Sequence, residues 1–122
     1  MKQVIIILSI IALTAIYCHS ASQIIYSNAA VDFYGYSPQF IKGDRITVYD
    51  EQNVLCGEYT IDTNGQYGLM SVYGDDPLSK DIDEGAVPGE GLTFYLNGQR
   101  LEPTDGSAII WTQDGERLRL DF

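Results

Sequence analysis

Apolar and polar side chains alternate along most of the chain after residue 29, with a period of two residues. Val31 and Phe33, for example, would lie on one face of an extended segment, and Tyr34 and Tyr36 on the other. This period is that of a β-strand with one buried face. We expect strands at 30–36, 45–49, 54–61, 67–73, 92–96, 99–102, 108–112 and 116–122. Residues 67–73 show no clear period and are apolar on both faces, as in a central strand. No segment after residue 29 has the period of an amphipathic helix, so we expect an all-β fold.

Three residue pairs between these segments favour tight hairpin turns. They are Asn64-Gly65, Asn97-Gly98 and Asp114-Gly115, and residues of these types adopt the positive φ angles that two-residue hairpins need. About seven or eight short strands joined in this way are typical of a small antiparallel β-sandwich of the immunoglobulin or prealbumin type. We therefore predict that fold for residues 30–122.

The start of the chain has the order of a secretory signal peptide. Lys2 precedes an apolar stretch at residues 4–17, and small residues follow at positions 20–22. The stretch is shorter than the roughly 20 residues of a membrane-spanning helix. We expect a signal peptide at residues 1–22 and a leader or edge strand at residues 23–29. The remaining domain would then be secreted or held at the cell surface, without membrane insertion.

The negative net charge of the chain argues against partners that are themselves strongly negative. The chain carries 17 acidic and 7 basic residues, for a net charge of -10. Nucleic acids and anionic lipid surfaces bind proteins through positive charge. We therefore expect no nucleic-acid partner, and an acidic surface that serves solubility or cation binding.

The cysteines and the histidine argue against an enzyme. Cys18 and His19 both lie in the predicted signal peptide, which leaves Cys56 alone in the exported chain. No internal disulfide and no Ser-His or Cys-His pair can then form. We expect Cys56 to be a small buried core residue and the domain to have no catalytic residues. Cys18 leaves one alternative open, which is lipid attachment at this cysteine instead of its removal.

Two stretches of the chain, 54–77 and 83–99, contain a series of short motifs. They are Cys56-Gly57, Gly65-Gln66-Tyr67-Gly68, Asp75-Asp76-Pro77, Gly85-Ala86-Val87-Pro88-Gly89 and Phe94 to Gly98. This series resembles a domain of exported bacterial surface proteins that is similar to the transthyretin-like and carboxypeptidase-regulatory-like β-sandwiches. The resemblance implies a binding or structural module without catalytic activity.

A long acidic loop at residues 74–91 is a candidate calcium site. Calcium binds six to eight oxygen ligands, and extracellular modules need only weak affinity. The candidate ligands are Asp75, Asp76, Asp81, Asp83 and Glu84. The spacing is not that of an EF-hand, and a solvated run of charges without a metal is the alternative.

Four tyrosines form a candidate ligand-binding face. Strand parity places Tyr34, Tyr36, Tyr49 and Tyr95 opposite the aliphatic residues of their own strands. An exposed aromatic surface can stack on sugar rings or anchor a protein partner. The alternative is that these tyrosines only pack against neighbouring strands.

These features together predict a secreted, non-catalytic binding module. Its ligand would be a carbohydrate or a protein at a cell surface or in a matrix, with calcium as the one candidate cofactor. The alternative function is a structural subunit of an extracellular assembly. In that case an edge strand, or residues 23–28, would pair with a neighbouring subunit by β-strand addition.

Overall fold

The computed structural model describes residues 23–75 and 85–122. These residues form strands, turns and extended segments and no helix, which confirms the all-β prediction. Accordingly, this part of the chain contains no helix that could cross a membrane. The predicted signal peptide at residues 1–22 lies outside the described residues, as do four of the five candidate calcium ligands, Asp76, Asp81, Asp83 and Glu84.

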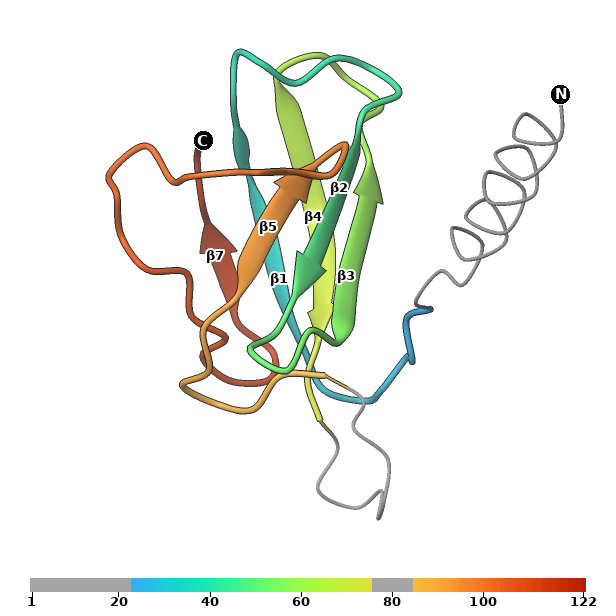
Figure 1. The fold of residues 1–122 in the computed structure, drawn as a ribbon, viewed down its shortest axis with the longest axis vertical. Helices are drawn as coiled ribbons and strands as arrows, with labels where there is room; N and C mark the ends of the chain where they lie inside the picture. Colours follow the sequence, from blue (N-terminus) through green and yellow to red (C-terminus); the bar gives the residue numbers. More distant parts are fainter. Residues whose placement is uncertain (1–22, 76–84) are drawn as a thin grey trace, which may run out of the picture.

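Seven strands make up the fold (Figure 1). They are β1 (Ala30–Tyr36), β2 (Arg45–Tyr49), β3 (Leu55–Thr60), β4 (Gln66–Tyr73), β5 (Thr93–Leu96), β6 (Gln99–Arg100) and β7 (Arg117–Arg119). The first two have the bounds that the alternation predicts. The strand predicted at 108–112 is reduced to an isolated bridge between Gly91 and Ile110, because this segment pairs with residues 89–92 and not with the end of the chain.

The expectation of an entirely antiparallel fold is wrong at one pair of strands. β7 lies parallel to β1, with Asp32 opposite Arg117, Phe33 opposite Leu118 and Tyr34 opposite Arg119, while the other pairs of neighbouring strands are antiparallel. Residues 101–116 form a crossover segment that passes round the side of the sheet from the edge strand β6 to the opposite edge strand β7 (Figure 1). The chain therefore reaches the position beside β1 from the far edge of the sheet.

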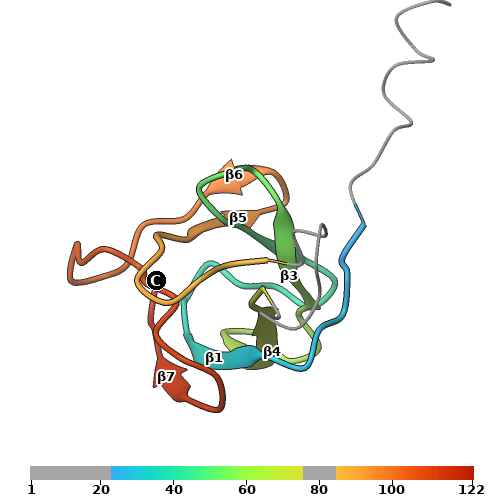
Figure 2. The ribbon, with the colours of Figure 1, turned by 90° about the horizontal axis from the view of Figure 1, so that it is seen from below.

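The seven strands form one sheet, whereas the predicted sandwich has two separate sheets. The strand order is β6-β5-β2-β3-β4-β1-β7, and the sheet curls on itself. Figure 2 shows β5 and β6 on one side and β1 and β7 on the other. Strand twist accumulates across a sheet, and the curl buries the aliphatic faces against one another inside the same sheet.

The core lies inside this curl. Its fully buried side chains come from both halves of the sheet, from the turn before β2 and from the residue that follows β3. The largest are Phe33, Phe40, Phe94, Ile46, Ile61, Met70, Val31, Val48, Val72 and Cys56. Burial of Cys56 confirms its predicted place in the core.

The crossover segment covers the open side of the core through Trp111. This side chain is 2 % exposed, and its indole N–H donates a hydrogen bond of 2.9 Å to the carbonyl oxygen of Val72. Backbone hydrogen bonds also join Trp111 N to Glu90 O and Leu92 N to Ile109 O, each at 2.9 Å. Residues 109–111 thus pair with residues 89–92, and the predicted hairpin between 108–112 and 116–122 around Asp114-Gly115 does not form.

Residues 23–29 contain no strand and lie against the end of β4. The Ser27 hydroxyl donates a 2.6 Å hydrogen bond to the carbonyl oxygen of Gly74. The ring of Tyr26 meets Tyr73 edge-on, with centroids 5.2 Å apart. In this structure residues 23–29 therefore contact the end of β4 and add no strand to the sheet.

Candidate binding groove

The pairing of β1 with β4 contains a register shift, and the outer surface of the sheet is hollowed at this point. The register shifts between Phe33 and Gly35, and Gly68 on β4 has a φ of 109°. A Cβ at Gly68 would lie 2.5 Å from the Cβ of Tyr34, a separation that real side chains do not reach. The close approach of the two strands at this point therefore requires glycine.

A groove lies at this irregularity, between β4, β1 and β7. Its volume is about 690 Å³. The lining residues come from all three strands and are Tyr34, Gly35, Tyr36, Gln66, Tyr67, Gly68, Leu69, Arg117 and Arg119. Figure 2 shows these three strands side by side. β7 completes the groove only because it lies beside β1.

Three large apolar side chains in the groove are open to solvent. Tyr34, Tyr36 and Leu69 are 40 %, 50 % and 50 % exposed. Single exposed apolar residues are normal on a protein surface, whereas several together indicate an interaction site.

A buried tyrosine supports the groove from below. Tyr67 is 3 % exposed, and its hydroxyl donates a 2.7 Å hydrogen bond to the carbonyl oxygen of Leu120. Burial raises the pKa of Tyr67 well above that of an ordinary tyrosine, and the charge of Asp121 adds to the rise. The hydroxyl therefore stays protonated and keeps this bond, which ties β4 to the end of the chain.

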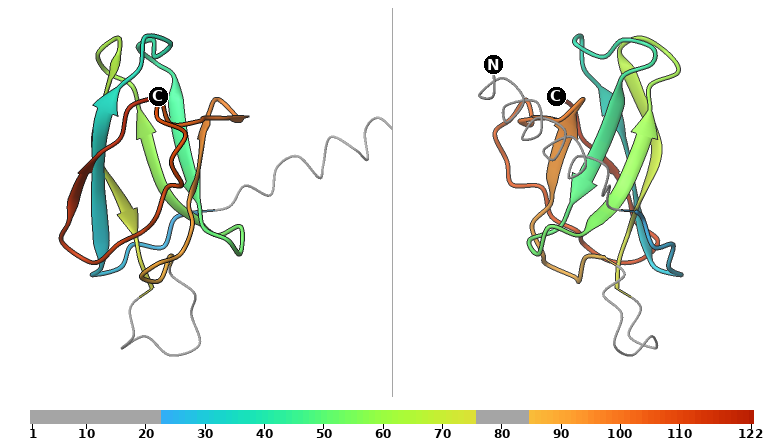
Figure 3. Two further views of the ribbon diagram at one scale, coloured as in Figure 1. Left: turned by 90° about the vertical axis from the view of Figure 1, so that its left-hand side faces the viewer. Right: turned by 45° about the vertical axis from the view of Figure 1, so that its right-hand side comes forward.

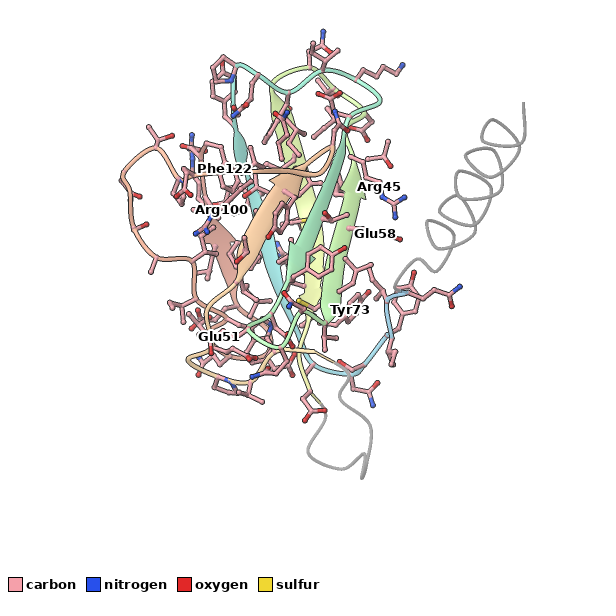
Figure 4. All side chains as sticks on the ribbon, viewed as in Figure 1. Arg45, Glu51, Glu58, Tyr73, Arg100 and Phe122 are labelled. Atoms are coloured by element: carbon pink, nitrogen blue, oxygen red, sulfur yellow. The ribbon has the colours of Figure 1, made fainter. Side chains whose placement is uncertain are left out.

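Two guanidinium groups border the same groove. Arg119 makes an ion pair of 3.2 Å with Asp121, and both side chains are partly exposed. Arg117 has no carboxylate within ion-pair distance in residues 23–75 and 85–122. By contrast, Arg45 and Arg100 lie away from the groove and pair with Glu58 and Glu102. Figure 4 shows Arg45 and Glu58 close together on the right-hand side of the domain.

The structure divides the four predicted tyrosines into two pairs. Tyr34 and Tyr36 share the groove, while Tyr49 and Tyr95 line a separate hollow of about 440 Å³ between β2 and β5. The rings of this second pair meet edge-on, with centroids 5.7 Å apart. In the strand order β3 and β4 lie between β2 and β1, so the single predicted face is two distinct patches.

The structure brings together three carboxylates that the sequence analysis did not group. They are Asp50, Glu51 and Glu90. The turn between β2 and β3 carries Asp50 and Glu51. Figure 3 shows this turn and residues 85–92, which include Glu90, at the same end of the sheet. One oxygen of Asp50 accepts hydrogen bonds from the amides of Gln52 and Val54, each 2.9 Å long. Its other oxygen is buried without a hydrogen-bond partner among the described residues.

Burial also affects the acid–base behaviour of this cluster. Burial raises the pKa of the Glu90 carboxyl, the amide of Val87 partly offsets the rise, and the charges of Asp50 and Glu51 add to it. No group of three acidic, histidine or cysteine side chains in the described ranges could hold a metal ion. Of the predicted calcium ligands, only Asp75 is described, and its amide donates to the carbonyl oxygen of Ala86 at 2.7 Å.

The sequence analysis did not assign Leu69, Arg117 and Arg119 to a site. The alternation of Arg117, Leu118 and Arg119 predicts that both arginines share a face. That signal does not identify the neighbouring strand, because the β1–β7 contact joins segments far apart in the chain.

No protein-family model, curated protein or solved structure matches this chain.

Proposed function

We propose that the protein is an exported, non-catalytic module that binds a carbohydrate at a cell surface or in an extracellular matrix. The observation that carries this proposal is the groove, where Tyr34, Tyr36 and Leu69 stand exposed around one hollow. Tyrosine rings offer an apolar face for a sugar ring and a hydroxyl for its polar edge. The signal-like residues 1–22 support export, and the resemblance to transthyretin-like domains supports a role in binding.

The residue inventory supports a role without catalysis. The chain contains one histidine, His19, which lies in the predicted signal peptide. The exported chain then lacks the usual general base for a serine or cysteine nucleophile. Cys56 is buried in the core, away from the groove.

The edge strands of the sheet favour ligand binding over assembly by strand addition. The two edge strands are short, with β6 spanning Gln99–Arg100 and β7 spanning Arg117–Arg119. Short edges that carry charged side chains hinder pairing with another chain. We therefore place the structural-subunit alternative second.

The calcium hypothesis for residues 75–84 is part of this proposal. It predicts a higher melting temperature in millimolar calcium than in a chelator, because a bound ion stabilises only the folded state. An unchanged melting temperature would reject a calcium site in the loop and would leave the groove proposal intact.

A glycan array tests the proposed function. We expect the protein to bind a subset of glycans, and Tyr34→Ala and Tyr36→Ala each to lower the affinity roughly tenfold or more. Tyr95→Ala is the matched control, because it removes a tyrosine from the other patch. Loss of binding in the control with full binding in Tyr34→Ala would move the site to the β2–β5 hollow.

A further inference from the structure

The charge of the groove differs from that of the rest of the molecule. The whole chain has a net charge of -10, yet the groove is lined by two arginines and, in the described chain, by no acidic residue. Two carboxylates on or next to these strands are Asp32, whose Oδ1 accepts from Ser71 at 2.8 Å, and Asp121, which pairs with Arg119. Asp32 is the register neighbour of Arg117, but the two do not form an ion pair.

We infer that the groove binds a carboxylated saccharide, that is, a chain containing uronic acid residues. This inference rests on the proposed function and narrows its ligand class. A guanidinium presents a planar fork of donors that matches a carboxylate. Arg117 offers this fork without first breaking an internal ion pair, and Arg119 can exchange Asp121 for the ligand at the exposed rim.

The register places the charged and aromatic groups within reach of one ligand. Tyr34 is opposite Arg119 in the parallel pairing, and Tyr36 follows two residues later along β1, about 7 Å further at the usual rise of a strand. A uronic acid ring stacked on Tyr34 therefore has the guanidinium of Arg119 on the neighbouring strand, whereas the neighbour of Tyr36 is Asp121, whose Oδ1 accepts from Tyr36 N at 2.9 Å. A neutral sugar could accept single hydrogen bonds from the arginines through its hydroxyl groups, but it would not match their charge.

An acidic peptide offers the same carboxylate chemistry, but the geometry favours the saccharide. A peptide bound by strand addition needs a long exposed edge, and β7 has three residues. Directly after β7, Asp121 O accepts a 3.0 Å hydrogen bond from Thr104 N, so the crossover segment occupies the continuation of that edge.

Titration calorimetry with matched ligands tests this inference. The probes are the trisaccharides of galacturonic, glucuronic and guluronic acid, each as the free acid and as its methyl ester, and an oligoglutamate peptide. We expect at least one free acid to bind roughly tenfold tighter than its ester, since the methyl ester removes the charge and with it the bidentate carboxylate acceptor, while it adds only one methyl group. Arg117→Gln should reduce this preference by roughly 3- to 10-fold.

Arg100→Gln is the matched control. Arg100 is an exposed arginine on β6 that pairs with Glu102 and lies outside the groove, so this variant should bind like the unmodified protein. Equal loss in both variants would show a general effect of net charge and would overturn the inference.

The remaining outcomes separate the inference from the proposed function. Equal binding of acid and ester, lost in Tyr34→Ala, would overturn the carboxylate preference and keep the saccharide groove. Tight binding of oligoglutamate with no saccharide binding would overturn both, in favour of a protein partner. Binding of a free acid that is insensitive to Tyr34→Ala and Arg117→Gln would place the site elsewhere and would also overturn both.

Discussion

The ring of Phe33 on β1 meets the ring of Phe94 on β5 edge-on across the core, with the two centroids 5.3 Å apart. In the strand order, β2, β3 and β4 lie between these two strands. A flat sheet would separate β1 from β5 by about 19 Å, since neighbouring strands are about 4.8 Å apart. The contact therefore exists only because the sheet curls, and the same curl turns β1 and β7 so that the groove is on the outer surface.

This contact predicts an energetic coupling between the two rings. In a double-mutant cycle of Phe33→Leu and Phe94→Leu, we expect a coupling free energy of about 0.5–1.5 kcal/mol, measured by urea unfolding. Phe33→Leu combined with Ile41→Ala is the control, because Ile41 is 61 % exposed and should be additive. A coupling near zero in the Phe33–Phe94 cycle would contradict the curled sheet.

The irregularity under the groove predicts unequal costs for two glycine substitutions. Gly89 has a φ of 88° with nothing near the position of a Cβ, so Gly89→Ala should cost only the backbone strain, about 1–2 kcal/mol. Gly68→Ala adds a clash with Tyr34 and should cost roughly 2–4 kcal/mol. Denaturant unfolding measures both. Equal costs would mean that β1 and β4 are not in close contact at the groove.

Burial of Glu90 predicts a pH dependence of stability. Because the pKa of Glu90 is raised in the folded state, the folded protein holds this proton more tightly than the unfolded chain. The contribution of this group to stability is therefore greatest below the unfolded pKa of about 4.3 and is lost as the pH rises through the folded pKa.

Glu90→Gln tests this dependence, since glutamine keeps an oxygen that can accept the hydrogen bond from Val87 without carrying charge. We expect the variant to be more stable than the unmodified protein at pH 7 and equally stable near pH 3.5. Glu102→Gln, at an exposed position, should show little difference at either pH. A stability deficit of Glu90→Gln that is the same at both values would refute the raised pKa.

Local signals in the sequence predicted the local structure well. Alternation located β1 and β2, and the Asn97-Gly98 pair forms the predicted turn between β5 and β6, with φ angles of 48° and 84°. These features depend on neighbouring residues, whose steric preferences act regardless of the rest of the chain.

The placement of β7 could not be predicted in the same way. Asp114-Gly115 has the composition of a hairpin turn, and Gly115 has the expected positive φ of 87°. However, the segment before it pairs with residues 89–92 and the segment after it pairs with β1. This choice is made by burial of Trp111 over the core, a long-range contact that a local pattern does not encode. The groove depends on the pairing of β7 with β1. Strand parity could therefore predict that Tyr34 and Tyr36 are exposed, but not that Arg117 and Arg119 lie beside them.

The most direct test of the groove as the binding surface is amide chemical-shift mapping by nuclear magnetic resonance. The titrant would be the tightest-binding trisaccharide of the calorimetric panel. We predict that shift changes concentrate at residues 34–36, 66–69 and 117–119. Shift changes confined to residues 47–53 and 93–98, or no changes at millimolar ligand, would contradict the account.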